Sequence, residues 1–197
     1  MNKRTKENFK KLGLIAFSLI LLIGASAQVK YSSKSMALTV SGTSTLHDWD
    51  MKSAVGTFEG NFTLNAAGAI TAVNGLSFST KGESLKSGHD AMDKNAYKAL
   101  KNDKAPLITY TSNAATITNL DATDYSVKST GKLTIAGTTL DAEIVATCKV
   151  NADKSITVMG SKKISMKEFG MAPPTFMMGT IKTGNDVTLK FDLKLNK

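Results

Sequence analysis

Two histidines, each followed by an aspartate, are the residues of this sequence that could perform acid–base chemistry or bind a metal. They are His47 with Asp48 and His89 with Asp90. Neighbouring strand residues point to opposite faces, so such a dipeptide does not easily direct both side chains at one atom. There is also no HxH or HExxH spacing. We therefore predict no metal site and no enzyme, and we expect His47 and Trp49 to serve as a polar handle. A hydrolase using His47 and Asp48 is the weakest alternative.

The single cysteine, Cys148, is the only candidate thiol nucleophile. One cysteine excludes an internal disulfide. A catalytic thiolate needs a nearby base and an electropositive setting, and the neighbouring residues offer neither. Because Cys148 lies on the apolar face of an alternating segment, we predict a buried, inert thiol.

The segment from Gly131 to Val150 predicts the hairpin around which the remaining strands are organised. Leu133 and Ile135 alternate with polar residues, and Ala136-Gly137-Thr138 marks a turn. The apolar positions of the second arm recur with a period of two, as in a strand with one buried face. They are Leu140, Ala142, Ile144, Ala146, Cys148 and Val150. Several of these inward residues are small, so they either face bulky partners or leave a space.

Alternating segments recur along the chain and predict an all-β protein. A polar, helical stretch interrupts them between residues 81 and 104, with Asp90 placed to cap the helix. Many strands at close spacing favour an antiparallel sandwich or barrel, and closure into a barrel would remove exposed sheet edges. The other predicted strands cover residues 36–41, 55–64, 70–79, 106–112, 115–120, 125–135, 156–166 and 187–195.

A methionine-rich segment, Met166–Ile181, is unusual for a connecting loop, because loops are mostly polar. Methionine adapts to irregular apolar partners. We leave two interpretations open: a lid that seals the core, or a pliable gate over a ligand-binding mouth. Its apolar members are Phe169, Met171, Phe176, Met177 and Met178.

The N-terminus has the pattern of a secretory signal peptide. Basic residues precede an apolar run at 12–23, and Ala25-Ser26-Ala27 is a small-residue cleavage site. We predict a signal peptide at 1–27, a single domain at 28–197, and a periplasmic or secreted protein without stable membrane insertion. Removing five basic residues and one acidic residue lowers the net charge from +9 to +5. The sequence contains no cluster of basic residues interleaved with aromatic ones, which is the pattern that would indicate nucleic-acid binding.

Five short segments, in this order, resemble the YceI-like family of secreted lipid- and polyisoprenoid-binding proteins. The resemblance implies an antiparallel, lipocalin-like β-barrel of about eight strands with one short helix, enclosing a long apolar tunnel for a prenyl or acyl chain. The family usually carries an Arg-Asp pair and an aromatic pair in the helical excursion, and Ser87–Met92 departs from this pattern. The matching segments are Ser41–Trp49, Gly56–Gly60, Ala105–Tyr110, Gly131–Thr139 and Phe169–Gly170.

From this resemblance we predict that the protein binds a long-chain isoprenoid or fatty amphiphile, and that it uses no cofactor other than this bound lipid. The alternative is a structural or stress-response barrel with a filled core and no ligand. A homodimer is left open. The residues predicted to line the tunnel are Phe58, Phe62, Phe78, Ile108, Tyr110, Leu133, Ile135, Ala142, Ile144, Ala146, Phe176, Met177 and Phe191.

Overall fold

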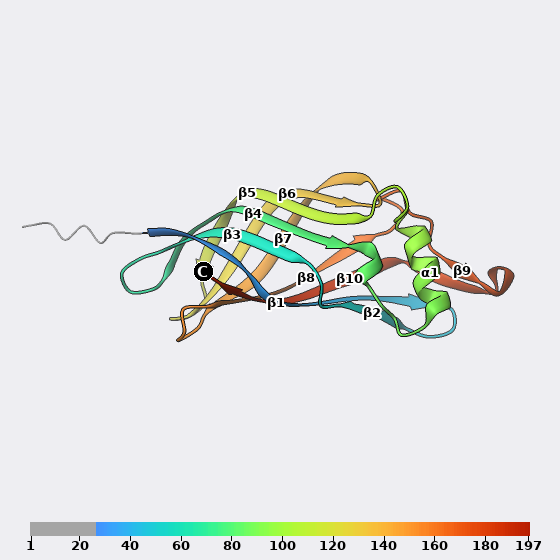
Figure 1. Cartoon of the computed structure of the whole chain (residues 1–197), viewed down its shortest axis with the longest axis horizontal. Helices are drawn as coiled ribbons and strands as arrows, with labels where there is room; N and C mark the ends of the chain where they lie inside the picture. Colours follow the sequence, from blue (N-terminus) through green and yellow to red (C-terminus); the bar gives the residue numbers. More distant parts are fainter. Residues whose placement is uncertain (1–26) are drawn as a thin grey trace, which may run out of the picture.

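The structure is a computed structural model and describes residues 27–197. The predicted signal peptide, residues 1–27, therefore lies almost wholly outside the described residues. Figure 1 shows strands wound along one long axis, with the helix across one end. The elements are β1 (Ala27–Ser44), β2 (Trp49–Ser53), β3 (Thr57–Leu64), β4 (Ile70–Lys81), a 3-10 turn η2 (Gly82–Ser84), α1 (Asp90–Ala99), β5 (Leu107–Asn119), β6 (Asp124–Ile135), β7 (Thr138–Val150), β8 (Ile156–Ser165), β9 (Thr175–Phe176), a 3-10 turn η3 (Met177–Gly179) and β10 (Ile181–Asn196).

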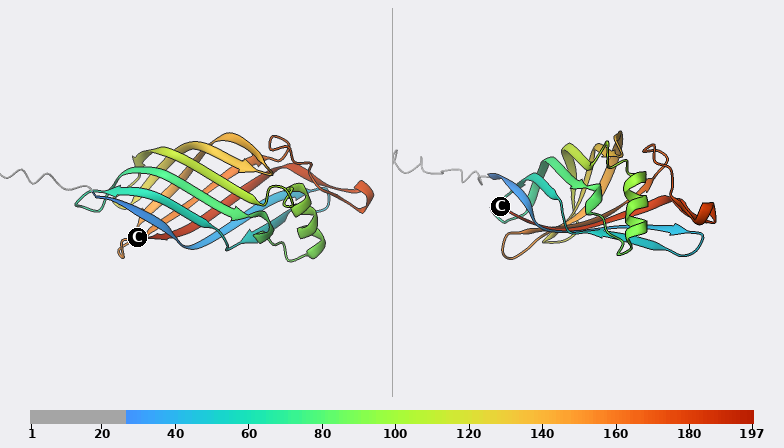
Figure 2. Two further views of the ribbon diagram at one scale, coloured as in Figure 1. Left: turned by 45° about the horizontal axis from the view of Figure 1, so that its top comes forward. Right: turned by 45° about the vertical axis from the view of Figure 1, so that its right-hand side comes forward.

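Eight of the ten strands close into an antiparallel barrel, which confirms the predicted fold class. The strand order is β1-β3-β4-β5-β6-β7-β8-β10, and pairing of β10 with β1 completes the ring. The short strand β2 adds to β1 where β3 leaves it, and β9 adds to the start of β10. The strands cross the barrel at a slant (Figure 2). Closure leaves few exposed sheet edges.

The hairpin of β6 and β7 has the predicted register and facing. Ala136 and Gly137, both with positive φ, form its two-residue turn, as the twist of a tight hairpin requires. Ala142, Ala146 and Cys148 are buried. Their outward neighbours carry ion pairs across the two strands, between Lys132 and Asp141 and between Lys128 and Glu143. The period-two pattern therefore assigned the two faces of this hairpin correctly.

Three local predictions differ from the structure. The sequence analysis missed β2, because only Trp49 and Met51 mark its inward face. The two segments predicted at 106–112 and 115–120 form one strand, β5, whose register against β6 shifts between Thr111 and Ala115. Asp90 is the first residue of α1, and His89 is the N-cap, with no side-chain capping bond.

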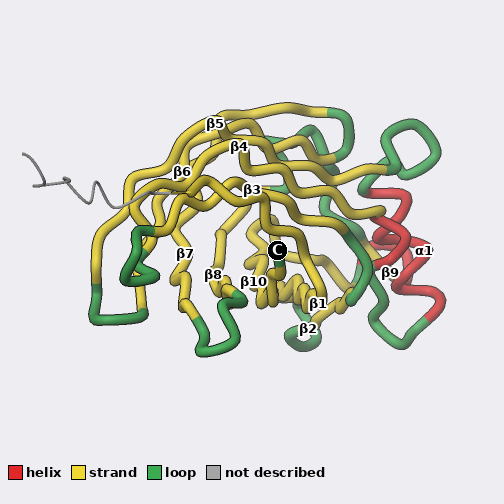
Figure 3. The backbone as a smooth tube through the Cα atoms, turned by 60° about the vertical axis from the view of Figure 1, so that its left-hand side comes forward, coloured by secondary structure: helices red, strands yellow, loops and turns green. Residues whose placement is uncertain are grey.

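The end of the barrel opposite α1 is filled with side chains. It carries the β3–β4, β5–β6 and β7–β8 turns, and it faces the viewer in Figure 3. Tyr31 and Phe62 pack edge to face, with ring centroids 5.4 Å apart, and the Tyr31 hydroxyl donates to the Lys154 carbonyl at 3.2 Å. Tyr125, Ile156 and Leu195 are at most 1 % exposed in the same cluster.

Within residues 27–197, no helix is long and apolar enough to cross a membrane.

Candidate functional site

The end of the barrel near α1 encloses an apolar cavity, the outer chamber, with a volume of about 130 Å³. Its walls come from the inward faces of the barrel strands and from β2. The helix α1 and the segment after β8 cover it. No charged side chain lines it. The helix contributes Met92, Ala96, Ala99 and Leu100; the segment after β8 contributes Met166, Met171, Pro174 and Phe176.

A second cavity, the inner chamber, lies deeper in the barrel and has a volume of about 90 Å³. The two chambers share five lining residues, so they adjoin one another inside the barrel. Phe58, Phe62 and Val73 line the inner chamber towards the filled end of the barrel. The barrel interior is therefore blind at one end. The shared residues are Leu38, Phe78, Ile108, Ile135 and Leu189.

The two chambers together border a long part of the barrel wall. On β10 alone, the lining residues extend from Thr183 in the outer chamber to Leu193 in the inner one. Ten residues of extended strand span about 33 Å along the strand at a rise of roughly 3.3 Å per residue, and a shorter distance along the barrel axis because the strands are slanted. A volume this small over such a length suits one extended chain better than a bulky ring system.

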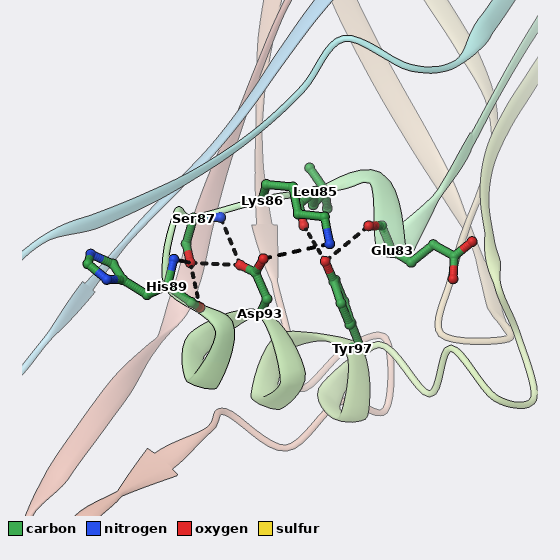
Figure 4. Close-up of polar contacts among 7 residues, drawn as sticks. All are labelled: Glu83, Leu85, Lys86, Ser87, His89, Asp93 and Tyr97. Carbon is green, nitrogen blue, oxygen red and sulfur yellow. Dashed lines mark hydrogen bonds and ion pairs between the residues drawn. The ribbon is translucent and has the colours of Figure 1, made fainter.

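Polar contacts beneath α1 hold this helix over the outer chamber (Figure 4). The Asp93 side chain is 8 % exposed, and its Oδ1 accepts hydrogen bonds from the Ser87 amide at 2.8 Å and the Ser87 hydroxyl at 2.7 Å. Lys86 lies with its Nζ 3.8 Å from Asp93 Oδ2 and 5.0 Å from the Tyr97 ring centroid. The Tyr97 hydroxyl lies 2.9 Å from the Leu85 carbonyl, to which it donates. Burial alone would raise the pKa of Asp93, but the Ser87 bonds and the Lys86 charge together lower it.

The Asp93 contacts predict a pH-dependent attachment of α1. A carboxyl whose pKa is lowered by folding stabilises the protein above its unfolded pKa of about 3.9, and this contribution disappears as the pH falls through the folded pKa. We expect Asp93→Asn to lower the thermal midpoint at neutral pH by roughly 2–4 °C, the effect of about 1 kcal/mol in a chain of this size. The difference from the wild type should vanish in acid. Thermal denaturation of both proteins from pH 7 to pH 3 measures it, and a constant difference would contradict the prediction.

Most residues predicted to line the tunnel do border the chambers. Phe176 borders the outer chamber, and Phe78, Ile108 and Ile135 border both. The others that border the inner chamber are Phe58, Phe62, Tyr110, Leu133, Ile144, Ala146 and Phe191.

Three predicted site residues lie elsewhere. Met177 begins the 3-10 turn η3, is 75 % exposed and borders neither chamber. Ala142 is buried in a core cluster with Phe169 and Met171, and it borders neither chamber. His47 is exposed and also lines neither chamber.

The His47–Trp49 segment forms a tight connection between β1 and β2, closed by hydrogen bonds between Ser44 and the backbone of His47. The Nδ1 atom of His47 lies 2.6 Å from the backbone carbonyl oxygen of Asp48, so the ring contacts the backbone of the connection itself. Trp49 is half-buried in the wall of the outer chamber, and its Nε1 donates to the Thr43 carbonyl at 3.0 Å. Within residues 27–197, no group of three His, Cys, Asp or Glu side chains is placed to hold a metal ion.

The lining also includes residues that the sequence analysis did not assign to it. Met92, Ala96 and Leu100 fall at helical spacing in the sequence, but a helix face alone does not reveal what it covers. Leu189 lies in the alternating segment 187–195 and borders both chambers. Lys162 had no role, although its even spacing from Ile156 and Val158 would have placed it inside.

Cys148 lines the inner chamber as a buried free thiol, as predicted, and burial raises its pKa to about 12. Because the thiolate is the reactive form, we expect Ellman's reagent to label the native protein at pH 8 more than about a hundredfold more slowly than the denatured protein. Fast native labelling would mean that the register of β7 is shifted by one residue, which turns every side chain to the other face.

The fold and the cavity define a class of protein: a helix-capped antiparallel β-barrel with an apolar interior that is blind at one end. Residues 25–195 match the YceI-like domain, so the chain belongs to the YceI-like family. No curated protein shows a significant sequence match to it.

Two solved structures share this fold. BcnA of Burkholderia cenocepacia is 21% identical over 82% of this chain and 96% of its own, with a TM-score of 0.61. A polyisoprenoid binding domain from Saccharophagus degradans, described as implicated in plant cell wall breakdown, is 14% identical over 84% of this chain and 97% of its own, with a TM-score of 0.62.

Proposed function

We propose that this protein binds one long-chain hydrophobic molecule, an isoprenoid or a fatty amphiphile, with its chain extended through both chambers. The observation that carries the proposal is that two apolar chambers adjoin inside the barrel, because their walls share Leu38, Phe78, Ile108, Ile135 and Leu189. Each buried methylene contributes about 0.8 kcal/mol, so a long chain binds without extensive polar recognition. The description of the S. degradans neighbour as a polyisoprenoid binding domain fits this class of ligand.

The setting we propose is outside the cytoplasm, in the periplasm or beyond the cell. The basic, apolar and small-residue pattern at the N-terminus supports export. The proposed role is binding rather than catalysis. Among the barrel residues that border the two chambers, the polar groups are few and far outnumbered by aliphatic and aromatic side chains. This composition is typical of a site that holds a ligand.

Extraction of the purified protein with organic solvent tests the proposal. We expect mass spectrometry of the extract to find a hydrophobic molecule at about one per protein chain. The stripped protein should then bind a fluorescent fatty acid, and the extracted molecule should displace that probe. An empty extract together with no probe binding would favour the structural or stress-response alternative, against which the two cavities already weigh.

A further inference from the structure

Lys162 is the only charged residue in the wall of the inner chamber. It lies on β8, on the inward face that also carries Val158 and Ile164, and it is half-buried. The lysine side chain has a four-carbon apolar stem that can pack along an apolar surface while its ammonium extends towards water. An inward-facing lysine on an otherwise apolar strand face requires an explanation other than core packing.

The ammonium of Lys162 has no carboxylate partner. The adjacent Lys163 faces outwards, and its Nζ lies 2.7 Å from Asp186 Oδ2. Within residues 27–197, none of the ion pairs includes Lys162. The other polar groups of the chamber already contact each other, because the Tyr110 hydroxyl and Ser129 Oγ are 2.9 Å apart. Lys162 therefore provides the cation of this chamber that is free to bind a ligand.

Lys162 also lies where the barrel wall is split. The pairing of β7 with β6 runs from Thr138 to Lys149, but the pairing of β7 with β8 extends only from Ala146 to Val150. On β8 the last residue that pairs with β7 is Gly160, two positions before Lys162, whereas the pairing of β8 with β10 continues to Ser165. A groove on the outer surface, which Gly160 also lines, shares Ala146 and Phe191 with the inner chamber. The wall beside Lys162 is thus thin, and a polar group here can remain close to water.

An ammonium that has no carboxylate partner and stands beside an apolar chamber attracts an anion, because opposite charges at close range stabilise each other. We infer that the bound molecule is an amphiphile with an anionic head group, a carboxylate or a phosphate, which Lys162 binds at the split between β7 and β8 while the chain occupies the chamber. This inference rests on the proposed binding function and specifies its ligand class. A charge-assisted hydrogen bond of this kind fixes the orientation of a chain that the apolar walls bind without preference.

Three ligands with the same chain test the inference: laurate, dodecyl phosphate and dodecanol, each displacing a fluorescent neutral probe from the stripped protein at pH 7. We expect the wild type to bind the two anions on the order of tenfold more tightly than dodecanol, a ratio that corresponds to about 1.4 kcal/mol. Lys162→Met keeps the length of the stem and removes the charge. It should bind all three ligands with similar affinity, and its affinity for dodecanol should change by less than about twofold.

Two control variants separate the charge from its surroundings. Lys163→Met, on the outward face, should keep the preference for anions, and Lys162→Arg should restore it because the cation is retained. Equal binding of anions and dodecanol by the wild type, or an unchanged preference in Lys162→Met, would overturn the inference while leaving the proposed function in place. Failure of all three ligands to bind the wild type would overturn both.

Discussion

Ala146→Phe should prevent the barrel from retaining its hydrophobic ligand while leaving the empty protein folded. Ala146 is 9 % exposed and lines the inner chamber, so the new ring would occupy space that the ligand chain needs. If the ring excludes only two methylenes, the lost transfer free energy of about 1.6 kcal/mol weakens binding more than tenfold. The thermal midpoint of the stripped variant should differ little from that of the stripped wild type, because the ring fills an existing cavity.

The measurements are the amount of lipid recovered per mole of protein and the thermal midpoint of the stripped protein. Val145→Phe is the matched control, because Val145 is the next residue on the same strand, is 46 % exposed and faces outwards. It should retain the ligand. The opposite outcome has two parts: the wild type yields no lipid, and Ala146→Phe has a lower thermal midpoint than the wild type. This combination would indicate a filled core, and the binding proposal would fail.

Ala142→Phe should lower the stability of the protein, in contrast to Ala146→Phe, whose main effect is on ligand binding. Ala142 lies on the same face of β7 but lines neither chamber, and it packs in a cluster with Met166, Phe169 and Met171. Overpacking of a filled core costs about 1–3 kcal/mol. For a chain of this size, this corresponds to a thermal midpoint lower by roughly 2–12 °C.

Thermal denaturation of the two stripped variants in parallel checks this contrast. Ala142→Phe should melt earlier than Ala146→Phe, although both replace a buried alanine on one strand face with the same ring. If both variants melt together with the wild type, the space behind Ala142 is open and our description of the cluster is wrong. The Val145→Phe protein again controls for the added aromatic residue.

Strands and the direction of their faces are predictable from the sequence where apolar residues alternate over many positions. The β6–β7 hairpin and β10 follow this pattern, and the burial of Cys148 follows from it. Side chains alternate strictly along a strand, so a local pattern is sufficient to assign a face. The order of short motifs was sufficient to indicate the family that the domain match then established.

Short or irregular elements were harder to predict because their patterns are weak or interrupted. The five residues of β2 present only Trp49 and Met51 as apolar inward positions. The interruption in β5 comes from a register shift opposite Gly131, where an added Cβ would overlap the Thr111 carbonyl oxygen. Nothing local in the sequence separates such a shift from the end of a strand.

Which inward residues face a cavity depends on the three-dimensional packing of distant segments. Ala142 and Ala146 are the same residue type on the same face, four positions apart, and the sequence offers no distinction between them. The difference is made by β8, which pairs with β7 from Ala146 onwards, and by the segment after β8, whose Phe169 and Met171 pack in the cluster of Ala142. A small side chain leaves a cavity only if no side chain from a distant part of the chain packs against it. Period-two alternation carries no information about these packing partners.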